Sequence, residues 1–432
     1  MPIGWLVVPS SPSRQPIFPF RTVVLGALIP AFVFSAGLGA ILPIIAPFAV
    51  EQGASLAAAG LIAAMLPVGQ ILADLPAGAL ASRLGDRAAM LLAGSLAGLA
   101  FLAAALSPSL ITLGTAILLV GAANAVFQLA RHSYLTVVTP ATQRARVLST
   151  LGGVHRIGQF VGPFLGALVT LGGDTRGVFL VAVATSAAAT VTVLLARPRQ
   201  KAQPQRKAES SAHAELDADA ARSPAAKPTL LGILVEHRRK FLTLGTVALL
   251  VGIIRGARQQ VIPLWGEHIG LDPTTISLIF GLAGGIDMLL FYPAGKVMDR
   301  FGRLWLGVPA MVLLGITMAL IPVTATASGL AIVGVLLGFA NGLGSGIMMT
   351  ISSDVSPEIG RPQFLGIWRL LTDIGMGAGP LILSGGAALG SLAVGVWVAA
   401  AMGPLSSAGM QRWLPRYSDH ANRTTRRRAG LL

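Results

Sequence analysis

Charged side chains lie inside several long apolar stretches of this chain, where they can carry protons or bind a charged solute. A charge surrounded by hydrocarbon is costly unless it is paired or hydrated, so each of these residues is a candidate for a functional role. The candidates are Asp74, Arg131, His132, His155, Arg156, Arg255, Arg258, Asp287, Arg369 and Asp373. A carboxylate that pairs with an arginine releases it when protonated, which is chemistry that suits proton-dependent movement.

The composition is that of a membrane protein. Of the 432 residues, 54% are hydrophobic and 11% are charged, and the mean hydropathy is +0.74. A soluble chain carries about 25% charged residues. The absence of cysteine excludes disulfides, thiolate nucleophiles and cysteine metal sites. No set of paired His and Glu residues at helical spacing points to a metal site or to a membrane-embedded enzyme.

Twelve segments are long and apolar enough to cross a bilayer, which needs about 20 such residues. They lie near residues 21–50, 55–82, 88–107, 110–139, 143–171, 176–196, 240–267, 273–299, 303–323, 327–354, 362–388 and 390–412. The predicted fold is therefore an all-α membrane protein of twelve transmembrane helices. Residues 197–239 are polar and mixed in charge, which is typical of a linker. We expect a six-helix half at 1–196, a cytoplasmic linker at 197–239, a second half at 240–413 and a basic tail at 414–432.

The two halves share a sequence repeat with a constant offset. Pro76 and Pro293 are 217 positions apart (293 − 76 = 217), and each begins a short basic loop between apolar segments. The same offset relates Gly78 to Gly295, Arg83 to Arg300, Gly85 to Gly302, Asn124 to Asn341, Gly158 to Gly375, Gly162 to Gly379 and Pro163 to Pro380. The halves are thus pseudo-symmetric and parallel, and such repeats place a substrate site near the bilayer midplane between them.

The distribution of arginine predicts the orientation. The net charge of +15 arises mostly in alternate loops and at both termini, which is typical of membrane insertion and not of nucleic-acid binding. The basic loops carry Arg83, Arg87, Arg144, Arg146, Arg300, Arg303 and Arg361. By the positive-inside bias, these loops and both termini are expected in the cytoplasm.

The repeated loop resembles the signature of the major facilitator superfamily of secondary transporters, whose pattern is Gly-x-Leu-x-Asp-Arg-x-Gly-Arg. The second copy, Gly295-Lys-Val-Met-Asp299-Arg300-Phe-Gly302-Arg303, fits with one change of Leu to Val. The first copy departs from the pattern, because Ser82 replaces the Asp and Asp86 replaces the Arg, with Arg87 next. The resemblance implies a gating role for these loops and for Asp299, and it puts the usual gate of the first half in doubt.

A second resemblance points to one branch of that superfamily. The element Gly158-Gln-Phe-Val-Gly162-Pro163-Phe-Leu-Gly166 is similar to the Gly-x-x-x-Gly-Pro-x-x-Gly element of drug–proton antiporters. Small residues four apart also let two helices pack closely in any membrane protein, and the repeat of this element in the second half favours packing. The arginine that such antiporters carry in the fourth helix is absent, because Ile117 occupies its position.

Some of the charged residues lie at the same predicted depth along their helices and can therefore form pairs. Arg156 follows Arg144 by 12 residues and Asp287 precedes Asp299 by 12, so both lie about 18 Å inside. Asp74 and Arg369 share a depth of about 12 Å by the same reasoning. In the superfamily the fifth helix lies beside the eighth, and the second beside the eleventh. The resemblance therefore implies the ion pairs Arg156–Asp287 and Asp74–Arg369, which either break and re-form during transport or only fix the packing.

Further polar residues are candidates for a substrate cavity. They are Gln70, Asn124, His155, Gln159, Arg255, Arg258, Gln259, Asn341 and Trp368, with Asp373 facing the same region by symmetry. Arg131 lies near the end of its segment and is expected to extend toward the membrane surface. Five intramembrane arginines against three aspartates favour anionic or neutral amphiphilic substrates over cations.

The function predicted from these features is proton-coupled efflux of small molecules by alternating access. The alternative is proton-coupled import of sugars or organic acids by the same fold. A non-transporting receptor has little reason to carry so many buried charges. We expect no cofactor, a proton gradient as the driving force, a lipid bilayer and a small-molecule substrate as partners, a monomeric chain, and a bacterial cytoplasmic membrane as the location.

Overall fold

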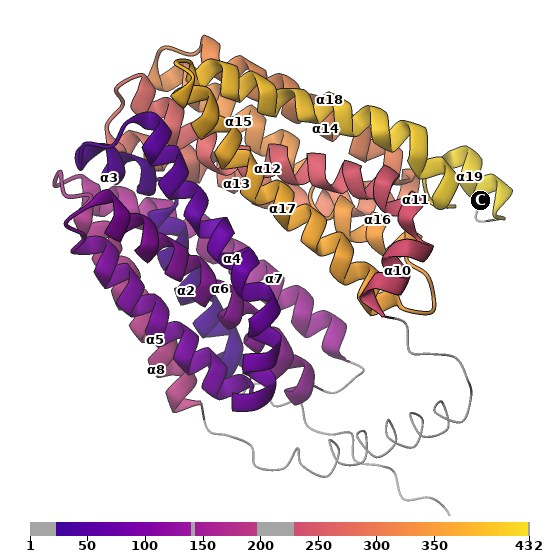
Figure 1. The fold of residues 1–432 in the computed structure, drawn as a ribbon, viewed down its shortest axis with the longest axis horizontal. Coiled ribbons are helices and arrows are strands. Elements are labelled where there is room, and N and C mark those ends of the chain that lie inside the picture. Colours follow the sequence, from indigo (N-terminus) through magenta and orange to yellow (C-terminus); the bar gives the residue numbers. More distant parts are fainter. Residues whose placement is uncertain (1–22, 140–142, 197–228, 431–432) are drawn as a thin grey trace, which may run out of the picture.

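The structure is a computed structural model that describes residues 23–139, 143–196 and 229–430. The described chain is helical throughout and forms two lobes (Figure 1). The first lobe contains η1 (Val24–Leu28), α2 (Ile29–Ile41), α3 (Ile45–Glu51), α4 (Leu56–Leu84), α5 (Asp86–Ala105), α6 (Leu110–Val138), α7 (Arg144–Thr170) and α8 (Arg176–Leu195). The second contains α10 (Leu230–Glu236), α11 (Arg238–Lys240), η3 (Phe241–Gly245), α12 (Thr246–His268), α13 (Pro273–Phe301), α14 (Arg303–Leu320), η4 (Ile321–Val323), α15 (Ala327–Leu343), α16 (Ile347–Val355), α17 (Arg361–Ala388), α18 (Leu392–Tyr417) and α19 (Arg423–Arg428).

The predicted fold of twelve membrane-length segments in two halves is confirmed. Most boundaries agree within two residues, although α18 continues five residues beyond the predicted end, to Tyr417. Two segments are interrupted. The first bends at residues 42–44, between α2 and α3, and the tenth bends at residues 344–346, between α15 and α16. Gly346 adopts a φ of 82°, a left-handed conformation that glycine takes without steric cost.

Capping residues and glycines determine where the helices start and stop. Ser55, Ser109, Asp272, Thr326 and Ser391 each accept a backbone N–H bond from the first turn of the helix that follows. At the other end of the bundle, Gly85 and Gly302 end α4 and α13 with φ angles of 83° and 101°. These two glycines belong to the repeated loops. We call the end of the molecule that carries them the motif end, and the opposite end the far end.

Two helices are more polar than the rest. Ten stretches of the described chain are long and apolar enough to span a membrane by length and composition alone. The repeat-related helices α7 and α17 are not among these stretches, although they have 27 and 28 residues. Both lie between the halves, with α7 packed against α13 and α17 packed against α4. Their polar residues therefore gather at the interface of the halves, where water and partner side chains can lower the cost of a charge.

Each half is built by the same pairwise packing. Helix α7 packs against α2, and its counterpart α17 packs against α12. Gly158 and Gly162 lie against the backbone of α2 near Phe32 and Ala40, while Gly375 and Gly379 lie against α12. This close approach of the backbones explains why the element Gly158–Gly166 is rich in small residues.

Two segments outside the predicted membrane helices, one in the linker and one in the tail, are docked onto the second half. Within the predicted linker, α10 packs against α17 and buries Ile233, whereas residues 197–228 lie outside the described residues. In the predicted tail, the carbonyls of His420 and Ala421 accept hydrogen bonds from the backbone N–H groups of Arg303 and Leu304, at 3.1 and 2.9 Å. The tail therefore caps the first turn of α14 in the second repeated loop.

We predict that Gly162→Ala destabilises the protein. A Cβ at this position would lie 2.6 Å from the backbone nitrogen of Ala40, so α7 and α2 must move apart. Overpacking of this kind costs about 1–3 kcal/mol, and thermal melting of the purified protein in detergent measures it.

The matched control is Gly153→Ala in the same helix, where an added Cβ meets no atom within 4 Å. This change is expected to be neutral or to raise stability by roughly 0.5–1 kcal/mol, because alanine favours the helix. Equal melting temperatures for the two variants would contradict the packing role of Gly162.

Candidate functional site

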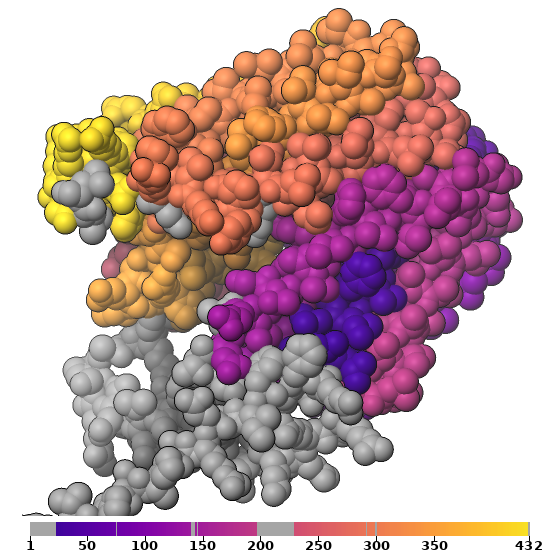
Figure 2. Space-filling view, turned by 180° about the vertical axis from the view of Figure 1, so that it is seen from behind, coloured from indigo at the N-terminus to yellow at the C-terminus, as the bar shows by residue number. Residues whose placement is uncertain are grey.

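The two halves are joined by contacts that run from the far end to the middle of the bundle. At the far end the Ser384 hydroxyl donates to the carbonyl of Ala57 at 2.6 Å, and the Thr274 hydroxyl donates to the hydroxyl oxygen of Thr170 at 2.9 Å. In Figure 1 the lobes converge near α3 and diverge toward α10 and α19. Figure 2 shows the same two lobes from behind, in contact over the end opposite the tail. The molecule is thus closed at the far end and wedge-shaped toward the motif end.

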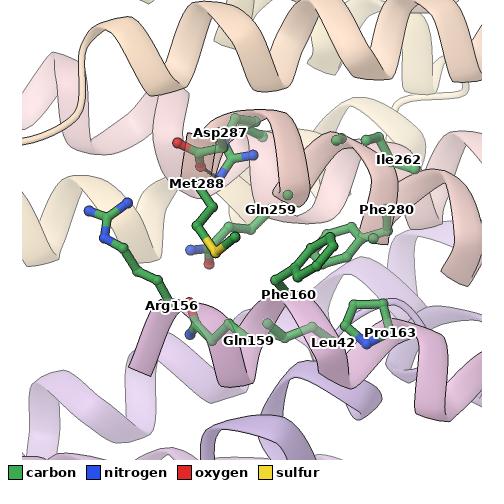
Figure 3. Close-up of a pocket in the computed structure, with 14 residues that line it drawn as sticks. Leu42, Arg156, Gln159, Phe160, Pro163, Gln259, Ile262, Phe280, Asp287 and Met288 are labelled. Atoms are coloured by element: carbon green, nitrogen blue, oxygen red, sulfur yellow. Dashed lines mark hydrogen bonds and ion pairs between the residues drawn. The ribbon is translucent and has the colours of Figure 1, made fainter. Parts of the chain in front are cut away.

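A cavity of about 90 Å³ lies where α7 of the first half faces α12 and α13 of the second (Figure 3). Its polar lining comes from both halves, and its apolar lining includes three aromatic or proline rings. It is lined by Leu42, Arg156, Gln159, Phe160, Pro163, Arg258, Gln259, Ile262, Phe280, Gly281, Ala283, Gly284, Asp287 and Met288. This cavity is the candidate substrate site, because it lies between the repeats and combines apolar walls with few polar groups.

Asp287 of α13 anchors the polar side of the cavity. Its Oδ2 lies 3.3 Å from Nη2 of Arg258 and accepts a 2.7 Å hydrogen bond from the amide of Asn341. Both partners belong to the second half. The ion pair of Asp287 thus forms with Arg258, and Arg156, the partner expected from the sequence, is also attracted to this carboxylate. Depth arithmetic placed the carboxylate at the right level but could not show that α12 presents an arginine to it within the same half.

Arg156 and Arg255 both bind the break in the tenth segment. Nη2 of Arg156 donates to the hydroxyl of Ser345 at 3.0 Å, a bond between the halves. Nη2 of Arg255 donates to the carbonyl of Gly344 at 2.5 Å, at the end of α15. The last carbonyls of a helix lack backbone partners and carry partial negative charge, which attracts cations. The break thus gives a binding place to one arginine from each half.

A second charged cluster connects α4 with α17. Nη2 of Arg369 lies 3.9 Å from Asp74, so the structure brings this expected pair together across the two halves. Nε of Arg369 also donates to Asp373, one turn along α17, at 3.4 Å. The Arg369 side chain is 70% exposed and that of Asp74 is 33% exposed. This cluster is more exposed than the Arg258–Asp287 pair, whose side chains are 16% and 12% exposed.

The repeated loops differ in their contacts. In the second loop Arg303 pairs with Asp354 at 2.9 Å, and Arg426 of the tail donates to the carbonyl of Arg300. In the first loop Arg87 donates to the carbonyls of Val193 and Leu194 in α8. The side chain of Asp299 lies outside the described residues. Arg83 and Arg300 are exposed, and a Cβ added at Gly295 would meet open space.

Sequence reasoning missed Asp354 and Ser345. Asp354 was detectable as an acid at the end of the tenth segment, near the motif end. Ser345 gave no signal, because its role depends on a break in the helix that the apolar pattern does not reveal.

Other predicted cavity residues lie outside the cavity lining. His155 shares a hydrogen bond of 2.5 Å with the Ser35 hydroxyl, and Asn124 accepts one from Gln128 at 3.2 Å. Trp368 is buried beside Phe364, and Gln70 is half-buried on α4. The expectation for Arg131 is wrong, because this side chain is 1% exposed and its guanidinium lies 5.9 Å from the ring centre of Phe127. The α6 helix directs it into the lobe instead of along the surface.

Two parallel six-helix halves with a polar cavity between them are the architecture of secondary transporters. The family model of the Major Facilitator Superfamily matches residues 27–380 and 244–430, so the chain belongs to this superfamily. No curated protein matches the sequence.

Several solved transporter structures share the fold. The nucleoside transporter NupG is 15% identical, with a TM-score of 0.68 over 91% of this chain and 98% of that one. A POT family transporter in complex with a thioalcohol-conjugated peptide is 14% identical, with a TM-score of 0.68 over 92% and 96%. The inward-open xylose transporter XylE from E. coli is 15% identical, with a TM-score of 0.64 over 91% and 94%. At these identities the likeness establishes the fold alone.

We predict that Asp287→Asn lowers the free energy of unfolding by about 3 kcal/mol, because it leaves a largely buried arginine without its carboxylate. Arg258→Gln should lower the free energy of unfolding by a similar amount, because the buried carboxylate of Asp287 then lacks its arginine. The double variant should be less destabilised than the sum of the single ones by roughly 0.5–3 kcal/mol, as measured by thermal melting. Strict additivity would contradict the direct pair.

Proposed function

We propose that this transporter is a proton-coupled exporter of small molecules that works by alternating access. The observation that supports the coupling is the ion pair between Asp74 of α4 and Arg369 of α17, at 3.9 Å across the two halves. A partly exposed carboxylate at this position can take up a proton, and the neutral acid no longer holds the arginine. Protonation then lowers the cost of moving α4 relative to α17.

In the observed conformation, the halves are closed at the far end and separated toward the motif end (Figure 1). The opposite conformation requires the contacts Ser384–Ala57 and Thr274–Thr170 to break and the motif loops to approach each other. Arg156 and Arg369 both bond across the halves nearer the middle. A rocking motion that opens the far end would therefore change the partners of both arginines.

The orientation is part of the proposal. The positive-inside bias assigns the motif end and both termini to the cytoplasm of a bacterial cell, with the chain in the cytoplasmic membrane. The wedge between the halves then faces the cytoplasm, which is the side from which an exporter loads its substrate.

The direction of transport rests on the resemblance of Gly158–Gly166 to the antiporter element. Because the contacts of Gly158 and Gly162 with α2 explain this element by packing, the direction has to be measured. Proton-coupled import by the same fold remains the alternative.

We predict that cells expressing the protein accumulate less of an exported dye than control cells do, and that a protonophore abolishes the difference. Asp74→Asn should reduce export at least tenfold, because the amide cannot be deprotonated to recapture Arg369. Dye fluorescence in cells that lack their own exporters is the measurement.

The matched control is Asp272→Asn. Hydrogen bonds from the Thr275 hydroxyl and backbone amide, at 2.6 and 2.9 Å, hold the pKa of the Asp272 carboxyl below its ordinary value. Asp272 is therefore ionised at neutral pH and caps α13, a task that asparagine performs equally well. Export should be unchanged in this variant. Higher dye accumulation in the expressing cells would establish import, and wild-type export by Asp74→Asn would exclude Asp74 from the coupling.

A further inference from the structure

The central cavity region carries more positive than negative charge. Arg255 and Arg258 are both attracted to Asp287, which is the one carboxylate found as a neighbour of these two arginines in the described part of the chain. Arg156 lines the same cavity and is attracted to Asp287 as well. The carboxylate is already bound by Arg258 and Asn341. Two guanidinium groups, of Arg255 and Arg258, that share one carboxylate leave a net positive charge deep in the bundle.

Neutral oxygens compensate for part of this charge. The carbonyl of Gly344 accepts from Arg255, and the hydroxyl of Ser345 accepts from Arg156. A dipole stabilises a cation less than a full negative charge does, and Nε of Arg255 and of Arg258 have no hydrogen-bond partner within the described residues. The electrostatics therefore favour an anion at this place.

The remaining lining defines the rest of the ligand. Gln159 and Gln259 offer amides that can bond polar substituents, while Phe160, Ile262 and Phe280 form an apolar wall (Figure 3). A cavity of about 90 Å³ is smaller than one of ~150 Å³ that holds benzene. The enclosed part of a ligand is thus an anionic head group with a few carbon atoms.

We infer that the cavity binds small organic anions, with the head group between Arg156 and Arg258 and the carbon chain against Phe160 and Phe280. This inference rests on the proposed transport function and names its substrate class. Planar head groups such as carboxylates match the fork of an arginine in two-point contacts.

The test is direct binding to the purified, full-length protein in detergent, without any gradient. The ligands are short-chain carboxylates, each with its matched amide and amine, so that shape is constant and charge varies. We expect carboxylates to raise the melting temperature and the amides and amines to leave it unchanged. Arg258→Gln and Arg156→Gln should weaken carboxylate binding at least tenfold, as the loss of a charged hydrogen bond does.

Two comparisons keep the result independent of folding defects. Arg156→Lys keeps the charge and should bind carboxylates more weakly than wild type but better than Arg156→Gln. Arg416→Gln removes an exposed arginine at the end of α18 and should bind as wild type does. No shift with any carboxylate, equal shifts with the amines, or the same shift with chloride or sulfate alone would overturn the inference.

The outcome is separate from that of the proposed function. Carboxylate binding without proton-dependent export would leave the anion site standing and remove the exporter. Proton-driven export of dyes by a protein that binds no carboxylate would support the exporter and exclude the anion site.

Discussion

The cost of a charge in hydrocarbon is the constraint that organises this molecule. Apart from Arg131 of α6, which is buried within the first lobe, the interior charges lie on α4, α7, α12, α13 and α17, which meet around the interface of the halves. There each arginine finds a carboxylate, a hydroxyl or a backbone carbonyl. The apolar helices α5, α8, α14 and α18 can face lipid because they carry no interior charge in the membrane. The distribution of charge thus separates the transport surface from the lipid surface.

Backbone packing provides the second constraint. Glycines in α7 and α17 hold these helices against α2 and α12, so the charged faces of α7 and α17 turn toward the opposite half. Because this glycine packing occurs in both lobes, each lobe is a compact unit that can move as one body. Motion is then concentrated at the interface, where the bonds are few and polar and can be exchanged.

The two lobes are symmetric in packing but not in chemistry. The second lobe holds Asp287, Arg255, Arg258 and the broken tenth segment, and its repeated loop is fastened by Arg303–Asp354 and by the tail. The first lobe contributes Arg156 and Asp74 from continuous helices. Its loop carries Ser82 in place of an acid and is held by Arg87 against α8. The polar lining of the candidate cavity comes from both lobes, with Arg258, Gln259 and Asp287 in the second and Arg156 and Gln159 in the first.

The sequence by itself determined the membrane class, the twelve segments, the parallel repeat and the level at which each charge lies. These follow from apolar length and from a rise of about 1.5 Å per residue, both of which are local properties. It also placed Asp74 and Arg369 at one depth, where the structure brings them together.

Only the tertiary structure decided which charges touch. The direction of a side chain around its helix axis depends on how neighbouring helices are rotated, which no local pattern encodes. For this reason Asp287 pairs with Arg258 of its own half, and Arg131 is buried instead of exposed. Arg156 reaches a helix break that the apolar run of residues 327–355 does not reveal. The sequence determines how deep a residue lies along its helix, whereas helix packing determines the direction in which its side chain points around the helix axis.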